Sequence, residues 1–264
     1  MKKYLVIGNP ISHSLSPKLH NYWIKKNNIK ASYDKKELNE AGIEEIILEI
    51  KNGKIDGINV TLPFKKSVIP FLDQLTPLAE EAQSVNTIFK KDNKVIGDNT
   101  DIGGFEQSLE YINYNVKNKK VFILGAGGVT PSIIIALRKL GVDKIILSNR
   151  TKEKAENIKK FYKDLDIVDW GEKPDFDMII NTTSLGLKKT DEIKLNYEEI
   201  GGNKLFYDII YNPKETEFLR KAKQSGNKIA NGKMMFIYQA RLAFVLWHSV
   251  LPKLNDEILK MLEQ

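Results

Sequence analysis

The chain of 264 residues contains no cysteine. This absence excludes disulfide bonds, thiolate metal ligands and cysteine nucleophiles. Histidine is also scarce, since His13, His20 and His248 stand far apart in the sequence and none belongs to an H-E-x-x-H pattern. A protein metal site needs a suitable set of ligands at matching spacing. We therefore expect no metal cofactor.

Long apolar runs are missing as well. A membrane-spanning helix needs roughly 18 or more consecutive apolar residues, whereas the longest clean runs here, residues 133–137 and 243–247, have the length of core segments. Lys2 and Lys3 precede a short apolar run, as in a signal peptide, but Gly8 and Pro10 end that run early. We expect a buried first strand, a cytoplasmic protein and no membrane partner.

The charge is unbalanced, with a formal net charge of +7 and a pI near 9.2. Such a balance can indicate binding to nucleic acid. The lysines are nevertheless spread along the chain among acidic residues, as in residues 35–49 and 152–156, and aromatic residues are not interleaved with them as a stacking platform requires. We expect a solvated basic surface that attracts anionic small molecules, and no nucleic-acid partner.

Strand and helix patterns alternate over the first 60 residues, which is typical of a parallel α/β layer. Strands are expected at residues 4–8, 31–36 and 55–62, and helices at residues 17–26 and about 38–50. Further along, residues 85–97 are expected to form a hairpin that turns at Asp92-Asn93.

A second alternating series begins near residue 119. Strands are expected at residues 121–124, 144–147, 178–181 and 205–210, and helices at residues 131–140, 152–162 and 234–249. The predicted fold class is α/β, with two α/β domains and a cleft between them. Residues 1–102 plus 235–264 would form the first domain, to which the C-terminal helices return, and residues 103–234 a Rossmann-type dinucleotide-binding domain.

The sharpest local motif is a glycine turn between a predicted strand and a predicted helix. It reads Gly125-Ala126-Gly127-Gly128. Glycine permits the tight turn and lets backbone N–H groups at a helix N-terminus approach a pyrophosphate. The third small position of the fingerprint is Thr130, which is bulkier than the usual Gly or Ala. A tight structural turn without a ligand is the alternative.

The next strand indicates which dinucleotide is bound. An NAD site usually has Asp or Glu here, to accept hydrogen bonds from the ribose 2′-hydroxyl, whereas this chain has Asn149, Arg150 and Thr151. Arg150 could form a fork with a 2′-phosphate, with Lys154 one helical turn away. The alternative is a solvated helix start, but next to the glycine turn we favour NADP as the cofactor.

Polar side chains in the first domain follow the predicted strands, at the edge where open α/β sheets bind ligands. Ser14 and Ser16 suit a carboxylate, or they cap a helix. Lys65 lies just past the third strand, where a surface lysine is common. Asp101 could be the N-cap of the next helix, and Asn86 comes from the hairpin.

Taken together, these segments resemble the shikimate dehydrogenase family, from about residue 5 to residue 247. In order along the chain, the similar motifs are Gly8-Asn9-Pro10-Ile11-Ser12-His13-Ser14-Leu15-Ser16-Pro17, Asn59-Val60-Thr61-Leu62-Pro63-Phe64-Lys65, Val85-Asn86-Thr87, Asn99-Thr100-Asp101, the glycine turn, Asn149-Arg150-Thr151, Asn181-Thr182-Thr183-Ser184-Leu185-Gly186, Asp208-Ile209-Ile210-Tyr211-Asn212-Pro213, and Gly232, Met235, Gln239 and Ala240. No single motif is unique, but the ordered set is specific.

The resemblance implies reversible, NADPH-dependent reduction of 3-dehydroshikimate to shikimate, in aromatic amino-acid and chorismate biosynthesis. It implies that Ser14, Ser16 and Tyr211 hold the substrate carboxylate, that Lys65, Asn86, Asp101 and Gln239 hold the ring hydroxyls with Thr61 beside them, and that Asn181, Thr182, Ser184 and Gly232 belong to the cofactor site. Lys65 and Asp101 would be the catalytic pair. Gln239 is on the returning helix, so the site would straddle the cleft, and domain closure would exclude water.

Several alternatives stay open from the sequence. A carboxylate beside Lys65 favours the charged lysine, so we expect the pair to act as one coupled unit rather than as separate acid and base. Quinate or NAD could also be used. A non-catalytic dinucleotide sensor on the same scaffold is a rival of another class. The chain could be a monomer or a homodimer.

Overall fold

The structure, a computed structural model, describes residues 1–188 and 190–263, and the chain divides into two compact units. Unit 1 holds residues 1–104 and the residues from Ile237 onward, and unit 2 holds Phe105–Phe236. The predicted boundaries after residues 102 and 234 differ from these by two residues each. The chain passes between the units inside two helices, α4 (Thr100–Tyr111) and α9 (Lys233–His248), so no linker composition marks the crossings.

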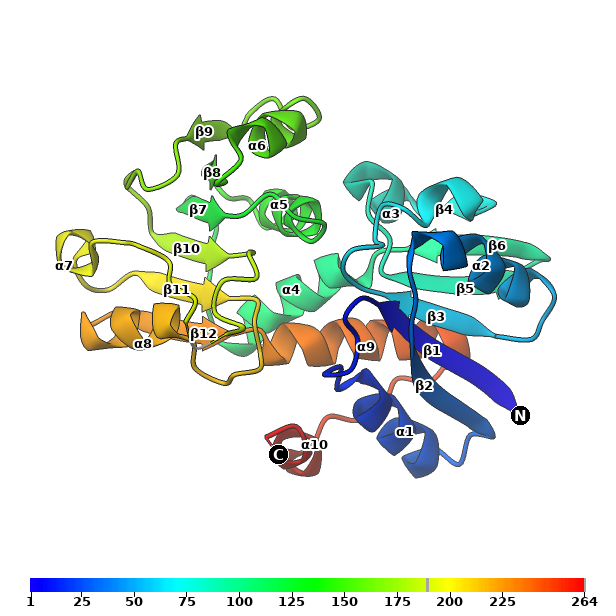
Figure 1. The fold of residues 1–264 in the computed structure, drawn as a ribbon. Coiled ribbons are helices and arrows are strands. Elements are labelled where there is room, and N and C mark those ends of the chain that lie inside the picture. Colours follow the sequence, from blue (N-terminus) through cyan, green and yellow to red (C-terminus); the bar gives the residue numbers. More distant parts are fainter. Residues whose placement is uncertain (189, 264) are drawn as a thin grey trace. The chain divides into compact units, whose positions relative to one another are not determined.

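Among the described residues, unit 1 has one six-stranded sheet in the order β2-β1-β3-β5-β6-β4 (Figure 1). Its strands are β1 (Lys2–Gly8), β2 (Ala31–Glu37), β3 (Gly57–Val60), β4 (Gln74–Leu75), β5 (Thr87–Lys91) and β6 (Lys94–Asp98). The first three are parallel, while β5 runs antiparallel to β3 and β6. The ends of β1, β3 and β6 and the start of β5 therefore share one edge of the sheet, and polar loops follow there.

Helix α2 (Ile43–Lys51) shows how apolar spacing builds the core of unit 1. Ile43, Ile46, Ile47 and Ile50 are buried together against β3, β5 and β6. The helix begins at Ile43 rather than near residue 38, because a 3-10 turn (Glu40–Gly42) precedes it and the Asn39 side chain accepts the Gly42 N–H. The remaining helical segments of this unit are α1 (Ser16–Lys26), a 3-10 turn (Ile69–Phe71), α3 (Pro77–Ala82) and α10 (Asp256–Met261).

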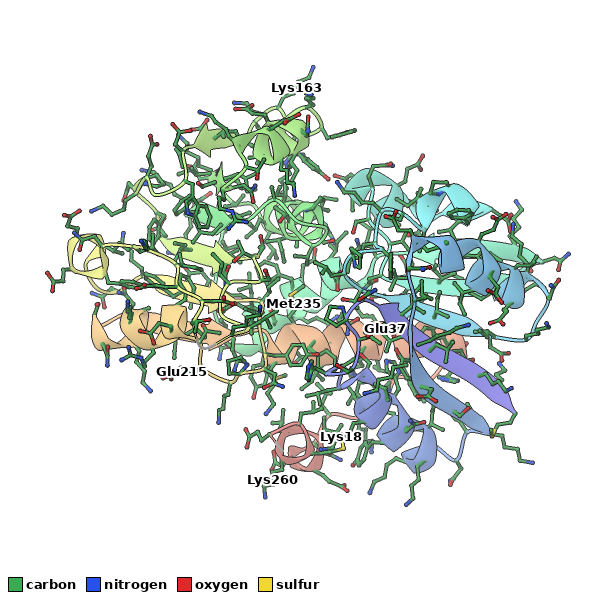
Figure 2. All side chains as sticks on the ribbon, viewed as in Figure 1. Lys18, Glu37, Lys163, Glu215, Met235 and Lys260 are labelled. Carbon is green, nitrogen blue, oxygen red and sulfur yellow. The ribbon has the colours of Figure 1, made fainter. Side chains whose placement is uncertain are left out.

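The C-terminal helix α10 is fastened to α1. Lys18 Nζ, labelled in Figure 2, donates to the Met261 carbonyl at 2.6 Å. The Tyr22 hydroxyl donates to Glu257 at 2.6 Å. Asn255 caps α10 by accepting the Ile258 N–H at 3.0 Å. These polar contacts join two segments far apart in the sequence.

In the described part of unit 2, one six-stranded sheet is parallel throughout, in the order β12-β11-β10-β7-β8-β9 (Figure 1). The strands are β7 (Lys120–Leu124), β8 (Lys144–Ser148), β9 (Asp166–Val168), β10 (Met178–Asn181), β11 (Leu205–Asp208) and β12 (Lys228–Asn231). The strand order reverses between β7 and β10, which is the Rossmann arrangement expected from the sequence.

Besides parts of α4 and α9, the described residues of unit 2 form the helices α5 (Thr130–Lys139), α6 (Lys152–Lys159), α7 (Tyr197–Ile200) and α8 (Glu217–Gln224). The core packs Phe122, Ile179 and Phe206 from the sheet against Phe218 and Leu219 from α8. Helix α5 is buried along almost its whole length, which is typical of a helix enclosed in the interior of a protein. Within the described residues, no helix is long and apolar enough to cross a membrane.

Candidate functional site

The centre of the unit 1 site is an ion pair between Lys65 and Asp101. Lys65 Nζ donates to Asp101 Oδ2 at 2.5 Å, and the two side chains are only 13% and 8% exposed. The Lys65 carbonyl accepts the Val85 N–H at 2.8 Å, which anchors the lysine to the segment before β5. Lys65 is therefore not the ordinary surface residue that its position after a strand allowed.

Asp101 lies in the first turn of α4. The side chain that accepts a helix N–H there is Asn99, from Ile102 at 3.4 Å, so the alternative of Asp101 as the N-cap is wrong. Its second oxygen accepts Asn86 Nδ2 at 2.9 Å. The carboxylate thus accepts hydrogen bonds from an ammonium and an amide, in a place that is largely closed to solvent.

Asn86 links this pair to the helix that returns from the end of the chain. Its amide nitrogen also approaches Gln239 Oε1 on α9 at 3.3 Å, and its amide oxygen accepts the Thr100 N–H at 2.7 Å. Lys65, Asn86, Asp101 and Gln239, predicted from separate motifs, are therefore brought together in unit 1. Lys65, Asn86 and Asp101 follow or precede strands at one edge of the sheet, and Gln239 on α9 contacts Asn86.

Three buried polar residues behind Asn86 had no predicted role. The Tyr33 hydroxyl donates to Asn59 Oδ1 at 2.6 Å, and Asn59 Nδ2 donates to Thr87 Oγ1 at 3.0 Å. The Thr87 hydroxyl in turn donates to Asn86 Oδ1 at 3.1 Å. The available signal was a polar residue inside a predicted strand, since Asn59 and Thr87 interrupt apolar runs that must be buried.

The loops after β1 and β3 contribute hydroxyl groups to the same edge. Ser14 Oγ accepts the Ser16 N–H at 3.3 Å, just before α1, while the N-cap residue of that helix is Leu15, which has no capping side chain. Ser16 is buried and Ser14 half-buried. The half-buried Thr61 follows β3, and its N–H bonds to the Ile7 carbonyl at the end of β1.

In unit 2 the glycine turn lies where the strand order reverses. Gly125 has φ of +111°, a conformation that favours glycine, and a Cβ there would meet Thr182 Oγ1 at 2.7 Å. The Ala126 N–H donates to Asn149 Oδ1 at 3.0 Å. Gly127 is exposed just before α5, so backbone at a helix N-terminus is open to a phosphate group. Gly128 completes the turn. The turn therefore fits a dinucleotide.

The end of β8 supplies the residues expected near a 2′-phosphate. Asn149 also donates to the Thr151 carbonyl at 2.8 Å, which holds the loop before α6. Arg150, Thr151 and Lys154 are exposed. Among the described residues, neither Arg150 nor Lys154 has an ion-pair partner, whereas their neighbour Lys152 pairs with Asp169 at 2.6 Å. Two cations are thus available to an anion at this edge.

Asp208, at the end of β11, organises the neighbouring strand ends. Its carboxylate is buried and accepts hydrogen bonds from Asn181 Nδ2 at 3.1 Å, Thr216 Oγ1 at 2.6 Å and the Ile210 N–H at 3.0 Å. Burial raises the pKa of Asp208 to about 6, although these hydrogen bonds lower it. Asn181 is therefore fixed by a buried acid, and Thr182 next to it is buried too.

Three other predicted residues lie in unit 2. Ser184 is exposed in the loop after β10. Tyr211 stacks on Phe236 with ring centroids 4.5 Å apart, and it belongs to a different unit from Ser14 and Ser16, with which it was expected to share the carboxylate. A Cβ on Gly232 would lie 1.9 Å from the Ile209 carbonyl, so close backbone packing alone requires glycine there.

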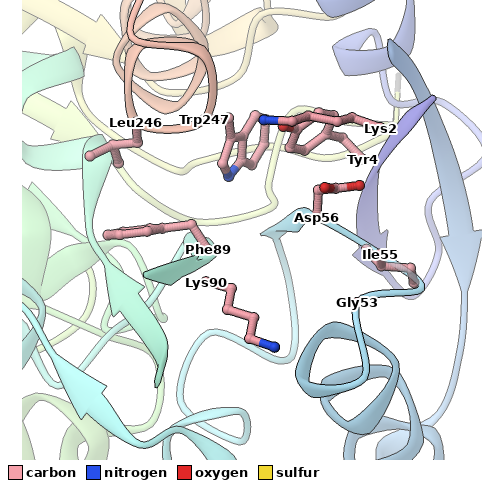
Figure 3. Close-up of a pocket in the computed structure, with 9 residues that line it drawn as sticks. All are labelled: Lys2, Tyr4, Gly53, Ile55, Asp56, Phe89, Lys90, Leu246 and Trp247. Carbon is pink, nitrogen blue, oxygen red and sulfur yellow. The ribbon is translucent and has the colours of Figure 1, made fainter. Parts of the chain in front are cut away.

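A separate cavity of about 260 Å³ opens in unit 1 near the start of β1 (Figure 3). Tyr4, Asp56, Phe89 and Trp247 are among its lining residues. None of the predicted substrate residues lines this cavity. In the described part of the chain, no group of three or more His, Asp or Glu side chains could hold a metal ion.

Dinucleotides bind where the strand order of a Rossmann-type sheet reverses. The glycine turn of unit 2 and the polar cluster of unit 1 thus assign the protein to the dinucleotide-dependent dehydrogenases. Residues 6–88 match the family model of the shikimate dehydrogenase substrate binding domain. Residues 107–184 match that of shikimate / quinate 5-dehydrogenase. The chain belongs to the shikimate dehydrogenase family, as its motifs predicted.

The relatives span the whole chain. A shikimate dehydrogenase (NADP(+)) of Pelagibacter ubique (strain HTCC1062) is 59% identical over 262 residues, 99% of each chain. The crystal structure of shikimate dehydrogenase from Aquifex aeolicus is similar with a TM-score of 0.90 and 37% identity, over 99% of this chain and 97% of that one. The enzyme from Thermus thermophilus, in complex with NADP(H) and shikimate, has a TM-score of 0.89 and 30% identity, over 100% of this chain and 98% of that one.

Proposed function

We propose that the protein catalyses the reversible, NADPH-dependent reduction of 3-dehydroshikimate to shikimate, in aromatic amino-acid biosynthesis in the cytoplasm. The observation that carries this proposal is the buried Lys65–Asp101 pair, joined to Asn86 and Gln239 at one edge of the unit 1 sheet. The relatives support this substrate and cofactor, because one is a shikimate dehydrogenase (NADP(+)) and another was solved in complex with NADP(H) and shikimate. A binding protein would have no need of a buried ammonium beside a carboxylate and two amides.

Substrate binding is assigned to unit 1 and to Tyr211. The hydroxyls of Ser14, Ser16 and Tyr211 would hold the carboxylate. The ring hydroxyls would meet Asn86 and Gln239, whose amides both donate and accept, with Thr61 beside them. These residue types suit the substrate, because a polyhydroxylated ring needs both hydrogen-bond donors and acceptors in a fixed arrangement.

Cofactor binding is assigned to unit 2. The backbone of the exposed Gly127 and the half-buried Gly128, with Gly125 and Ala126, would face the pyrophosphate. Asn149, Arg150, Thr151 and Lys154 would surround the 2′-phosphate, where two charge-assisted contacts favour NADP over NAD by about a hundredfold or more. Asn181, Thr182, Ser184 and Gly232 would border the nicotinamide. When bound, the cofactor supplies or accepts the hydride at a carbon atom.

Lys65 and Asp101 complete the chemistry. A hydride that reaches the ketone carbon moves the C=O electron pair onto oxygen, and that oxygen then needs a proton or a cation beside it. The Lys65 ammonium can supply either. Asp101 holds the ammonium in place and carries the compensating charge, so proton movement involves the pair as one unit. In the reverse direction the same pair accepts the hydroxyl proton.

The decisive experiment follows NADP⁺ reduction by absorbance with shikimate, with NAD⁺ and quinate in parallel. Turnover with NADP⁺ and shikimate alone is the expected result. Turnover with NAD⁺ or quinate would keep the reaction type and change the specificity. If no pair of substrate and cofactor turns over while NADP⁺ still binds, the protein is a dinucleotide sensor on a dehydrogenase scaffold, and the proposal is wrong.

A further inference from the structure

The glycine turn of this chain departs from the usual fingerprint at Thr130. Gly or Ala normally stands at this third small position, where close packing of helix and strand leaves little room. Thr130 is fully buried as the first residue of α5. A buried hydroxyl is costly unless it has hydrogen-bond partners. Its partners therefore indicate what the extra atoms do.

Those partners are the two strand ends at the reversal of the strand order. Thr130 Oγ1 lies 3.0 Å from the Gly125 carbonyl and 2.9 Å from Thr182 Oγ1. Thr182 Oγ1 lies 2.9 Å from the Leu124 carbonyl and 3.1 Å from that of Gly125. The two hydroxyl hydrogens are shared among these four contacts, which join the end of β7, the loop after β10 and the start of α5.

This hydroxyl pair acts on the orientation of the turn. Gly125 is the residue with φ of +111°, and its carbonyl accepts from both threonines. On the other side of the turn, the Ala126 N–H is held by Asn149. The peptide group between Gly125 and Ala126 is therefore fixed at both of its polar ends. The backbone that follows, at Gly127 and Gly128, takes its direction from that peptide.

We propose that Thr130 is a positioning residue for the dinucleotide: through Thr182 and the Gly125 carbonyl, its hydroxyl sets the turn in the geometry that receives the pyrophosphate. The inference rests on the proposed function, since it assumes that the turn binds NADP. Thr130 does not touch the cofactor in this scheme. It takes the place of the small residue of the usual fingerprint and adds hydrogen-bond contacts with Thr182 and with the Gly125 carbonyl.

The test compares three variants of the full chain. Thr130→Val keeps the shape and removes the hydroxyl, Thr130→Ser keeps the hydroxyl, and Thr130→Ala restores a residue usual in the fingerprint. We expect Val and Ala to weaken NADP⁺ binding about 3- to 10-fold, the range for loss of one buried hydrogen bond. Ser should bind within about twofold of the unaltered protein, because the same atoms remain. The KM for shikimate should not change.

Calorimetric titration of NADP⁺ without shikimate gives the Kd directly, and thermal unfolding is followed alongside. Ser108→Ala is the matched control, because the buried Ser108 hydroxyl contacts Tyr207 at 2.8 Å in the same unit and has no part in the turn. It should lower the Tm and leave the Kd unchanged. A Thr130 variant that only loses Tm in the same way would overturn the inference.

The outcomes separate the inference from the function on which it rests. If the unaltered protein fails to bind NADP⁺, the proposed function and the inference fall together. If it binds and both Val and Ala bind equally well, the inference alone is wrong. Should the Val variant not fold, the Ala and Ser pair decides, because both are smaller than threonine and cannot be overpacked.

Discussion

Lys65 and Asp101 carry the first prediction at the scale of single residues. If they act as one unit, Lys65→Ala should lower kcat at least about a hundredfold, because neither a proton nor a cation then meets the developing oxygen charge. Asp101→Asn should cause a comparable loss, and the double variant should be little worse than either single one. Steady-state kinetics with shikimate and NADP⁺ measure all three.

The matched control for this pair is Lys66→Ala, an exposed lysine one position along. It should leave kcat and both KM values unchanged. The Kd for NADP⁺ should be normal in every variant, since the pair belongs to unit 1 and the glycine turn to unit 2. Near-normal kcat in Lys65→Ala, or losses that simply add in the double variant, would exclude the coupled unit.

Arg150 gives the second prediction at this scale. Arg150→Ala should raise the KM for NADP⁺ by about 10- to 100-fold, the range for one lost charge-assisted contact to a phosphate, and hardly alter the KM for NAD⁺. Lys152→Ala, an exposed lysine already paired with Asp169, is the control and should change neither. Equal effects of Arg150→Ala on both cofactors would show that Arg150 does not read the 2′-phosphate.

At the scale of elements, the sequence was sufficient to predict helices and strands where buried apolar residues recur at a regular spacing. Predictions for strands β7, β8 and β10 and for the hairpin of β5 and β6 agree with the structure to within about two residues. Helix α2 ends close to its prediction but begins at Ile43 rather than near residue 38. Three short elements were not predicted: β4, β9 and α7 have two to four residues and are mostly exposed or only partly buried, so they lack the apolar run that marks the four-residue strand β10. Predicted ends also ran long, as at β11, which stops at Asp208 because that side chain turns to accept the Ile210 N–H.

The candidate site was likewise predicted only in part. Motif order alone supplied Lys65, Asn86, Asp101 and Gln239. The Tyr33–Asn59–Thr87 chain could not be read from the sequence, because strand pairing brings together residues that are 26 and 28 positions apart. The contact between the Thr130 and Thr182 hydroxyls could not be predicted either, because the two residues are 52 positions apart. Local sequence indicates which residues are polar and buried; their partners depend on sheet order.

Thr87 provides the prediction at this scale, since it links β3 to β5. Thr87→Val keeps the volume and removes the hydroxyl between Asn59 and Asn86. It should cost about 1–3 kcal/mol of unfolding free energy, because buried amide groups lose a partner. It should also raise the KM for shikimate through the misplaced Asn86. Urea unfolding and kinetics test both; Thr87→Ser should restore both, and a loss of stability with unchanged KM would leave Thr87 a purely structural residue.

At the scale of the whole molecule, both units carry buried ionisable groups, and acid changes the stability of the fold in opposite directions through them. In unit 1, His20 lies against Tyr33 with ring centroids 4.2 Å apart, and neither ring nitrogen has a hydrogen-bond partner among the described residues. Burial, with a smaller contribution from His248, lowers the pKa of His20 to about 3; burial likewise lowers that of His248 to about 4. In unit 2, burial raises the pKa of Asp208 to about 6.

These shifts predict that acid unfolds unit 1 first. Below pH 6.5, the ordinary pKa of histidine, the unfolded chain binds protons that folded His20 and His248 refuse. The stability that these two neutral histidines contribute is therefore fully present above pH 6.5 and is lost as the pH drops toward 4 and 3. For the buried His20, the free energy of unfolding falls by about 1.4 kcal/mol per pH unit in this range. Asp208 acts the other way: between its ordinary value of 3.8 and about 6, the folded form holds the proton more readily, so acid does not weaken unit 2 through this group.

Urea unfolding at a series of pH values, with hydrogen exchange to locate the opening, tests the asymmetry. Amides of β1, β2 and α1 should lose protection at a higher pH than those of β7, β10 and β11. His20→Phe should flatten the decline between pH 6.5 and about 4, because the aromatic cluster persists without a group that must charge, whereas His13→Gln, at an exposed position, should not. Simultaneous loss of protection in both units would show that they unfold as one cooperative body, and an unchanged slope in His20→Phe would mean that other groups govern the acid transition.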